Sequence, residues 1–252
     1  MILAAIIAGL AAGIFGSLVG LGGGVIIVPA LALVFGLPLT DAIPASLVGV
    51  VATALGGTAM YLREGHTDVP LALRAACLTV IGAVMGASVA VRVPERILEF
   101  GFSAMLFLIV WRMVQQRTHP EEHDVPEASM TRAVGLFVGS GVVAGLLGVG
   151  GGVLNVPAIR LALRRPMIVA VATSTMIIAF TAGAGAATFA AAGFMKWPLA
   201  TGCATGAFVG GRLGAWLAPR LPRKALQTIF VGVLLYVAVE FAVRAFGLPW
   251  WR

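Results

Sequence analysis

The stretch GSLVGLGGGVIIVP (residues 16–29) places three consecutive glycines inside an apolar segment, and GVVAGLLGVGGGVLNVP (141–157) repeats the pattern. Glycine is less favourable in a helix interior than every residue except proline. Each triplet is followed five residues later by a proline, Pro29 or Pro157. Close helix packing needs small residues four apart, not three glycines in a row. The two stretches therefore predict breaks in otherwise helical segments.

The composition is that of an integral membrane protein. Of the 252 residues, 60% are hydrophobic and 11% are charged, whereas soluble domains have about 25% charged residues. The mean hydropathy is +1.04, and apolar stretches of about 18 residues or more, long enough to span a bilayer, recur along the chain. Residues 1–20 lack the basic start and cleavage site of a signal peptide and are expected to be the first membrane element. We expect an all-α, multi-pass integral membrane protein.

The chain contains an internal repeat. Residues 13–112 align with 141–240 without a gap, at an offset of 128 positions. Turn prolines (Pro38 and Pro166) and small residues keep register together, which indicates a duplicated folding unit. We predict a first membrane repeat over 1–114, a polar cytoplasmic linker over 115–130 and a second membrane repeat over 131–252.

Each repeat opens with an apolar stretch that is too long for one crossing. Residues 2–35 as one straight helix would reach about 51 Å, against a hydrocarbon core of about 30 Å. Either this stretch crosses once with a large tilt, or it folds back at the glycines as a hairpin of two short helices. The other expected helices are ordinary membrane spans, at 40–62, 70–91 and 95–114 and again at 168–192, 198–219 and 223–246.

The positive-inside rule separates these two possibilities. If the glycine segments cross the membrane, both repeats have one orientation and the 17 Lys and Arg residues divide almost evenly between the two sides. If they fold back, each repeat makes three full crossings and the repeats are inverted. One side then holds only Arg92, Arg96, Lys196, Arg244 and Arg252. This asymmetry favours two inverted repeats, each a re-entrant broken-helix hairpin plus three transmembrane helices, with both termini periplasmic or extracellular.

The breaks themselves are the predicted substrate site. In transporters with inverted repeats, broken helices meet near the midplane and their free N-termini face anionic groups. The second half-helices are expected to begin at Gly24–Val25 and Gly152–Val153, where the first N–H groups lack intrahelical partners. Polar side chains at similar depth complete the site. The predicted substrate-binding residues are Gly22, Gly23, Gly24, Val25, Ser46, Gly150, Gly151, Gly152, Val153, Asn155, Thr173, Ser174 and Arg212.

The polar members of this set also have simpler explanations. Hydroxyls such as Ser46 can donate to an oxyanion without bringing charge into the bilayer, but they also bond backbone carbonyls of their own helix. Asn155 aligns with Ile27 and is an amide within an apolar run, which favours a cavity. Arg212 is either part of the site, as intramembrane charges commonly are, or reaches the cytoplasmic face by snorkelling.

Other patterns favour structural roles. The pairs Gly82/Gly86 and Gly210/Gly214 have small-xxx-small spacing and predict close helix packing. The run HPEEH (119–123) resembles a set of metal ligands, but it lies in the polar linker and favours a solvated loop, so we expect no metal and no cofactor.

The combined motifs resemble a known family. Two copies of G-x-GGG-x4-P, GLGGGVIIVP and GVGGGVLNVP, are each followed by an AS or TS segment and a G-x3-G…R-x-P stretch. The whole chain resembles the TauE/SafE family, also called the 4-toluenesulfonate uptake permease family. This resemblance implies an inner-membrane permease for sulfur-containing anions, with glycine motifs at Gly22–Gly24 and Gly150–Gly152 and a hydroxyl segment at Thr173–Ser174. The first copy has PAS where the second has the threonine–serine pair.

We therefore expect a secondary carrier for a small oxyanion such as sulfite or an organosulfonate, working by alternating access. Its expected partners are this anion, the lipid bilayer and a coupling proton or sodium ion, with no nucleic acid. Few titratable groups lie at depth, which argues against a membrane enzyme. Glu240, the carboxylate deep in an apolar run, is expected to pair with Arg244 four residues on. An anion channel and a non-transporting assembly subunit are the alternatives, and the oligomeric state stays open.

Overall fold

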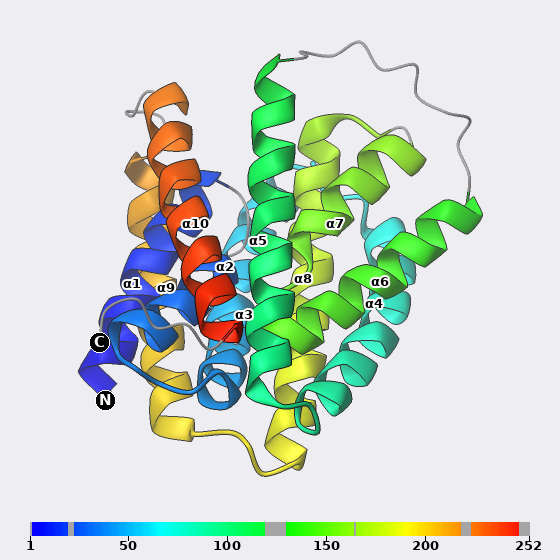
Figure 1. Ribbon diagram of the computed structural model, residues 1–252. Helices are drawn as coiled ribbons and strands as arrows, with labels where there is room; N and C mark the ends of the chain where they lie inside the picture. Colours follow the sequence, from blue (N-terminus) through cyan, green and yellow to red (C-terminus); the bar gives the residue numbers. More distant parts are fainter. Residues whose placement is uncertain (1, 20–22, 119–129, 164, 218–222, 247–252) are drawn as a thin grey trace. The chain divides into compact units, whose positions relative to one another are not determined.

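The structure is a computed structural model that describes residues 2–19, 23–118, 130–163, 165–217 and 223–246 (Figure 1). The described residues form helices and no strands, so the predicted all-α class is confirmed. The α-helices are α1 (Ile2–Val19), α2 (Gly24–Pro29), α3 (Leu39–Arg63), α4 (Val69–Ala90), α5 (Glu95–Thr118), α6 (Met130–Leu147), α7 (Gly152–Pro157), α8 (Met167–Ala191), α9 (Trp197–Leu217) and α10 (Arg223–Ala245).

The helix order repeats with the sequence. Adding 128 to the bounds of α1, α2 and α3 gives those of α6, α7 and α8, and α9 and α10 follow α4 and α5 in the same way to within one residue. The wide π-helical turns after the short helices, η1 (Ala30–Val34) and η2 (Ala158–Ala162), also correspond. Each begins directly after a proline, which cannot donate the usual helical hydrogen bond. The two halves of the sequence therefore form the same series of elements.

The glycine triplets break the helices where the sequence predicts. The first described residue after α1 is Gly23, which has φ +77° and precedes α2, while Gly151 has φ +78° and precedes α7. Glycine adopts this left-handed conformation without the steric cost of a Cβ. The carbonyl of Gly23 accepts hydrogen bonds from the N–H groups of Ile26 and Ile27 and so opens the new helix.

Each broken stretch folds back on itself. The short helix α2 packs against α1, and α7 with η2 packs against α6. In the second repeat, Ala133 and Phe137 of α6 share one apolar cluster with Ala158 and Ile159 of η2. These pairs lie on opposite sides of the break in the sequence and still touch one cluster, which is the pattern of a helical hairpin rather than a straight span.

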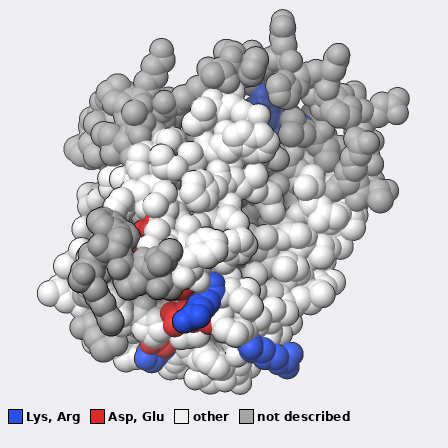
Figure 2. All heavy atoms as spheres, in the orientation of Figure 1, with Lys and Arg blue, Asp and Glu red and all other residues white. Residues whose placement is uncertain are grey.

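The surface and the helix lengths suit a bilayer. Among the described residues, α3, α4 and α8 are long and apolar enough to cross a membrane, and stretches of α1, α2 with η1, and α6 are shorter apolar helices. Figure 2 shows one face of the molecule, where few charged side chains interrupt the uncharged described surface. This is what a protein embedded in lipid requires.

The chain divides into two compact units. The larger unit comprises residues 1–92 with 125–218, and the smaller comprises 93–124 with 219–252. In the smaller unit α5 packs on α10: the rings of Phe102 and Phe241 are 5.0 Å apart, and the Ser103 hydroxyl donates to the Ala238 carbonyl at 2.8 Å. All of the predicted site residues that the structure describes belong to the larger unit.

In the larger unit, helices of one repeat pack on helices of the other. Helix α1 lies along α9, and the equivalent pair, α6 and α4, pack in the same way (Figure 1). Backbones touch at glycines: a Cβ on Gly210 would lie 2.1 Å from the Leu10 carbonyl oxygen, and a Cβ on Gly82 would lie 2.3 Å from that of Val138. The predicted packing role of Gly82, Gly86 and Gly210 is confirmed. The surroundings of Gly214 lie outside what the structure describes.

These contacts predict a stability difference between two glycines of one helix pair. Gly82→Ala places a methyl group against a backbone that has no room for it, so we expect a loss of about 1–3 kcal/mol in unfolding free energy. Gly139→Ala in α6 meets nothing within 4 Å and should be neutral or stabilising by up to about 1 kcal/mol. Thermal unfolding of both variants in detergent measures this. Equal melting temperatures would contradict the packing role.

Helices α3 and α8, which are equivalent in the two repeats, run antiparallel where they touch. A Cβ on Gly57 would lie 3.0 Å from Thr175 Cγ2, and a Cβ on Gly185 would lie 3.1 Å from Leu47 Cδ1. Gly57 corresponds to Gly185 and Leu47 to Thr175 at the offset of 128. The crossing is therefore nearly two-fold symmetric, as an interface between equivalent elements should be.

Candidate functional site

The two glycine-rich breaks meet in the larger unit. A Cβ on Gly24 would lie 2.6 Å from the Gly148 carbonyl oxygen and 2.9 Å from Val149 Cα. Only a residue without a side chain allows this approach. The predicted break residues that are described are all buried, apart from the half-buried Val153, and Gly22 lies outside the described residues. The structure thus brings the break of one repeat against that of the other.

Two of the predicted hydroxyls are held by backbone partners. The Ser46 hydroxyl, fully buried on α3, donates to the Gly148 carbonyl at 2.9 Å and so ties α3 to the second break. On α8, Thr173 Oγ1 accepts the Asp68 N–H at 3.1 Å. Both hydroxyls therefore have a structural hydrogen bond in this conformation.

Two other predicted residues have buried side-chain polar atoms with no hydrogen-bond partner among the described residues. Asn155 is 0% exposed, and neither its Oδ1 nor its Nδ2 has a hydrogen-bond partner in the described part of the chain. The Ser174 side chain is 1% exposed, and its hydroxyl likewise has no hydrogen-bond partner in the described part of the chain. Such groups are rare in folded proteins, because an unmade buried hydrogen bond costs about 1–3 kcal/mol. Asn155 lies in α7, directly after the second break, and α7 packs against α8, the helix that carries Ser174.

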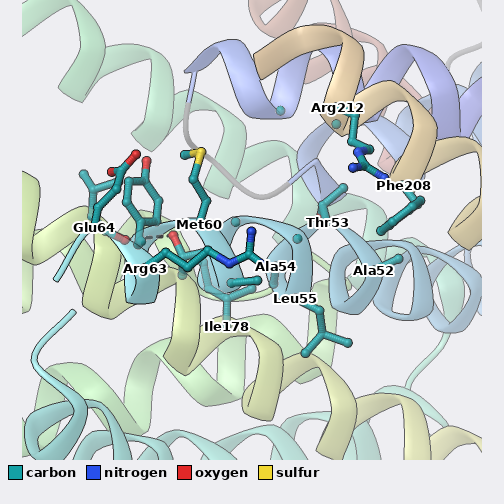
Figure 3. A pocket seen from close by; sticks show the side chains of 18 residues that line it. Ala52, Thr53, Ala54, Leu55, Met60, Arg63, Glu64, Ile178, Phe208 and Arg212 are labelled. Atoms are coloured by element: carbon teal, nitrogen blue, oxygen red, sulfur yellow. Dashed lines mark hydrogen bonds between the residues drawn. The ribbon is translucent and has the colours of Figure 1, made fainter. Parts of the chain in front are cut away.

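A pocket of about 790 Å³ lies among α3, α8 and α9 (Figure 3). Its walls include Met60, Ile178 and Phe208, and its charged residues are Arg63, Glu64 and Arg212. Of the predicted site residues that the structure describes, Arg212 alone lines it. In Figure 3, Arg63 and Glu64 stand on one side of the pocket, and Arg212 stands with Phe208 on the other.

Sequence reasoning missed Arg63 as a functional candidate. It lies in the last turn of α3, where a basic residue is expected for topology and for the helix dipole alone. Only the tertiary structure brings it to the same pocket as Arg212, which is 149 positions away. Arg212 is exposed, with its guanidinium carbon 5.6 Å from the centre of the Phe208 ring.

Two ion pairs connect different repeats near the ends of their helices. Asp68, just before α4, pairs with Arg165 in the segment after η2 at 2.9 Å, and Lys196, just before α9, pairs with Asp41 at the start of α3 at 2.5 Å. Asp68 and Lys196 are equivalent positions with opposite charge. Each pair therefore joins the loop of one repeat to the end of the hairpin of the other.

The remaining predictions concern the smaller unit and the linker. The expected local pair is confirmed: Arg244 Nε lies 3.3 Å from Glu240 Oε1, and the Glu240 side chain is 4% exposed. The HPEEH run (119–123) lies outside the described residues.

Comparisons with known proteins agree with the membrane fold. The profile of the family described as "Sulfite exporter TauE/SafE" matches residues 5–241. The chain is 30% identical over 263 residues to "Probable membrane transporter protein YunE" of Bacillus subtilis, a match that covers 93% of this chain and 95% of that protein. It is 28% identical over 236 residues to a "Probable membrane transporter protein" of Xylella fastidiosa, covering 91% and 90%.

No solved structure is significantly similar to the chain. The family profile nevertheless spans the described helices apart from the first and last few residues of the chain, and the relatives align over nearly their whole length. This protein therefore belongs to the TauE/SafE family of membrane transporters.

Proposed function

We propose that this protein is a secondary transporter for a small sulfur-containing oxyanion, such as sulfite or an organosulfonate. It works by alternating access around a site at the paired glycine-rich breaks. The observation that carries this proposal is the Asn155 amide, fully buried beside the second break with neither polar atom partnered in the described part of the chain. A buried amide in that state indicates a missing polar partner.

The chemistry of the site suits an oxyanion. The Asn155 amide and the Ser174 hydroxyl are uncharged donors, as are the first N–H groups of a helix. Such donors bind a negative solute without placing a fixed positive charge in the membrane. The proposed site comprises the break glycines with Val25 and Val153, the side chains Ser46, Asn155, Thr173 and Ser174, and the entrance residue Arg212. Hydrolysis and other catalysis form no part of this role.

We also propose that the repeats are inverted in the inner membrane, with both termini outside. The two loop ion pairs support this topology, because residues in contact must lie on one side of the bilayer. With three crossings per repeat, Asp68 shares a side with Arg165, and Asp41 shares the opposite side with Lys196. With four crossings per repeat, each pair would be separated by the membrane. The antiparallel contact of α3 and α8 is further support.

Cysteine cross-linking tests this arrangement in a protein whose own Cys77 and Cys203, both free thiols, are replaced by serine. A short bismaleimide should join the two introduced thiols in the double variant Asp68→Cys/Arg165→Cys, and likewise in Asp41→Cys/Lys196→Cys. The mismatched variant Asp68→Cys/Lys196→Cys is the control and should give no intramolecular product. A membrane-impermeant maleimide should label positions 68 and 196 from opposite faces. Labelling of both from one face would contradict the inverted topology.

Transport itself is tested with the purified protein in liposomes. We expect saturable uptake of labelled sulfite or ethanesulfonate, accelerated by the same anion inside, since counterflow distinguishes a carrier from a channel. Imposed proton and sodium gradients identify the coupling ion. Flux without saturation or counterflow would indicate a channel, and no flux of any anion under any gradient would overturn the proposal.

A further inference from the structure

The pocket among α3, α8 and α9 has charged residues that the proposed site at the breaks does not explain. It contains two arginines, Arg63 and Arg212, and the lining carboxylate Glu64. Neither guanidinium has a carboxylate partner within the described part of the chain, whereas Glu64 Oε2 lies 3.3 Å from His66 Nδ1. The pocket therefore carries positive charge in a bundle of mostly apolar helices.

The two threonine hydroxyls of the pocket are already bonded to backbone carbonyls, which leaves the arginines and the Tyr61 hydroxyl as its side-chain donors. Thr53 Oγ1 donates to the Val50 carbonyl at 2.9 Å, and Thr175 Oγ1 donates to the Val171 carbonyl at 2.8 Å. Each hydroxyl hydrogen is thus bonded within its own helix and is not available to a solute. The guanidinium groups of Arg63 and Arg212 carry several N–H donors each, in a planar arrangement that matches the oxygens of an oxyanion.

The position of Arg212 fits this role. Its stem starts within α9, and its guanidinium lies over the Phe208 ring, a contact that holds the cation in place without neutralising it. Arg63 reaches the pocket from the end of α3, and Figure 3 shows the two arginines on opposite sides of the space. The wall residues Leu55 and Met60 are exposed, so the pocket opens to the surface.

The repeat symmetry is broken at this pocket. At the offset of 128, Arg63 corresponds to Ala191 and Arg212 to Val84, while Phe208 corresponds to Val80. The equivalent region at the other end of the crossing between α3 and α8 therefore has no cation at either position. Since α3 and α8 run antiparallel, these equivalent regions lie toward opposite ends of the helices.

We propose that this pocket captures a soluble oxyanion at one end of the protein only, with Arg63 and Arg212 as its two cationic donors, before the solute reaches the breaks. This inference rests on the proposed transport function and adds a sided affinity to it. The anion binds more tightly from the end that carries Arg63 and Arg212, the end of the Asp68–Arg165 pair. Sided affinity changes the concentration at which each face saturates and leaves the direction of net flux to the gradients.

The test compares Arg63→Gln, Arg212→Gln and the double variant with Arg74→Gln. Arg74 is an exposed residue near the start of α4, follows the same loop and does not line the pocket, so it controls for surface charge. Ethanesulfonate and sulfite are the probes, in equilibrium binding to protein in detergent and in uptake by right-side-out and inside-out vesicles. Each pocket variant should weaken binding by about tenfold or more, as expected for the loss of a hydrogen bond to a charged group.

In the vesicles, KM should rise by a similar factor on the face with the pocket and stay within about twofold on the other face. The Arg74→Gln variant should match the wild type on both faces. Wild-type affinity in the double variant, or an equal rise of KM on both faces, overturns this inference. Flux in the wild-type protein would still support the transport function in that case. Absence of flux in the wild type overturns the transport function itself.

A phospholipid headgroup has the same anionic chemistry, and the lipid composition separates it from a soluble ligand. Binding of ethanesulfonate should be the same in vesicles of phosphatidylcholine alone and in vesicles with added phosphatidylglycerol. Competition by phosphatidylglycerol that the double variant abolishes would assign the pocket to lipid and overturn the proposal.

Discussion

Replacing Asn155 by isoleucine is expected to lower the rate of anion transport by about tenfold or more while leaving the protein at least as stable. Isoleucine occupies the equivalent position of the first repeat, Ile27, which is fully buried in the same kind of short helix. The substitution removes two buried polar atoms without partners among the described residues, and this relieves a cost of about 1–3 kcal/mol. It also removes an amide donor from the proposed site.

The measurements for Asn155→Ile are thermal unfolding in detergent and uptake by liposomes. Leu154→Ile, a volume-conserving change of the half-buried neighbour in α7, is the matched control and should transport normally. A variant that unfolds more easily than the wild type would assign the amide a structural role. Normal transport in a stable variant would remove Asn155 from the site.

Replacing Gly151 by leucine is expected to abolish transport and leave membrane insertion intact. A leucine at φ +78° is strained by about 1–2 kcal/mol, and its Cβ would lie 2.6 Å from the Ser140 hydroxyl. That hydroxyl donates to the Gly151 carbonyl at 2.7 Å, so the substitution displaces the backbone of the break. The flanking helices keep their apolar faces, and insertion depends on those.

Gly193→Leu is the control for backbone strain alone. Gly193 has φ +79°, is exposed in the loop after α8 and has nothing within 4 Å of a built Cβ. It should lose only the stability that the backbone strain costs, about 1–2 kcal/mol, and retain transport. The equivalent variant Gly23→Leu, at φ +77°, should behave like Gly151→Leu. Normal uptake by both break variants would show that these backbones do not contribute to the site.

The break positions could be predicted because their cause is local. A run of three glycines cannot extend an apolar helix without penalty, and the prolines at Pro29 and Pro157 fix where each short helix ends in a wide turn. The offset of 128 residues likewise predicts equivalent helices, because a duplicated pattern of apolar and turn residues gives the same local structure twice. These inferences needed no knowledge of which helices touch.

Partners could not be predicted, because they depend on contacts between distant segments. Ser46 and Ser174 are equivalent in sequence, yet the Ser46 hydroxyl bonds the Gly148 carbonyl while the Ser174 hydroxyl is buried without a partner in the described part of the chain. Arg63 carries no local signal beyond its place at the end of a helix. Its role in the pocket depends on α9, which folds against α3 from the other repeat.

The sequence by itself determined the membrane class, the duplication and the two helix breaks, since composition, periodicity and backbone preference are properties of short segments. Only the tertiary structure decided that the breaks adjoin, that the Asn155 side chain is fully buried, and that Arg63 and Arg212 line the same pocket near one end of the helices. The physical reason is that burial, hydrogen-bond pairing and charge proximity are set by packing between helices, and packing joins residues that lie far apart along the chain.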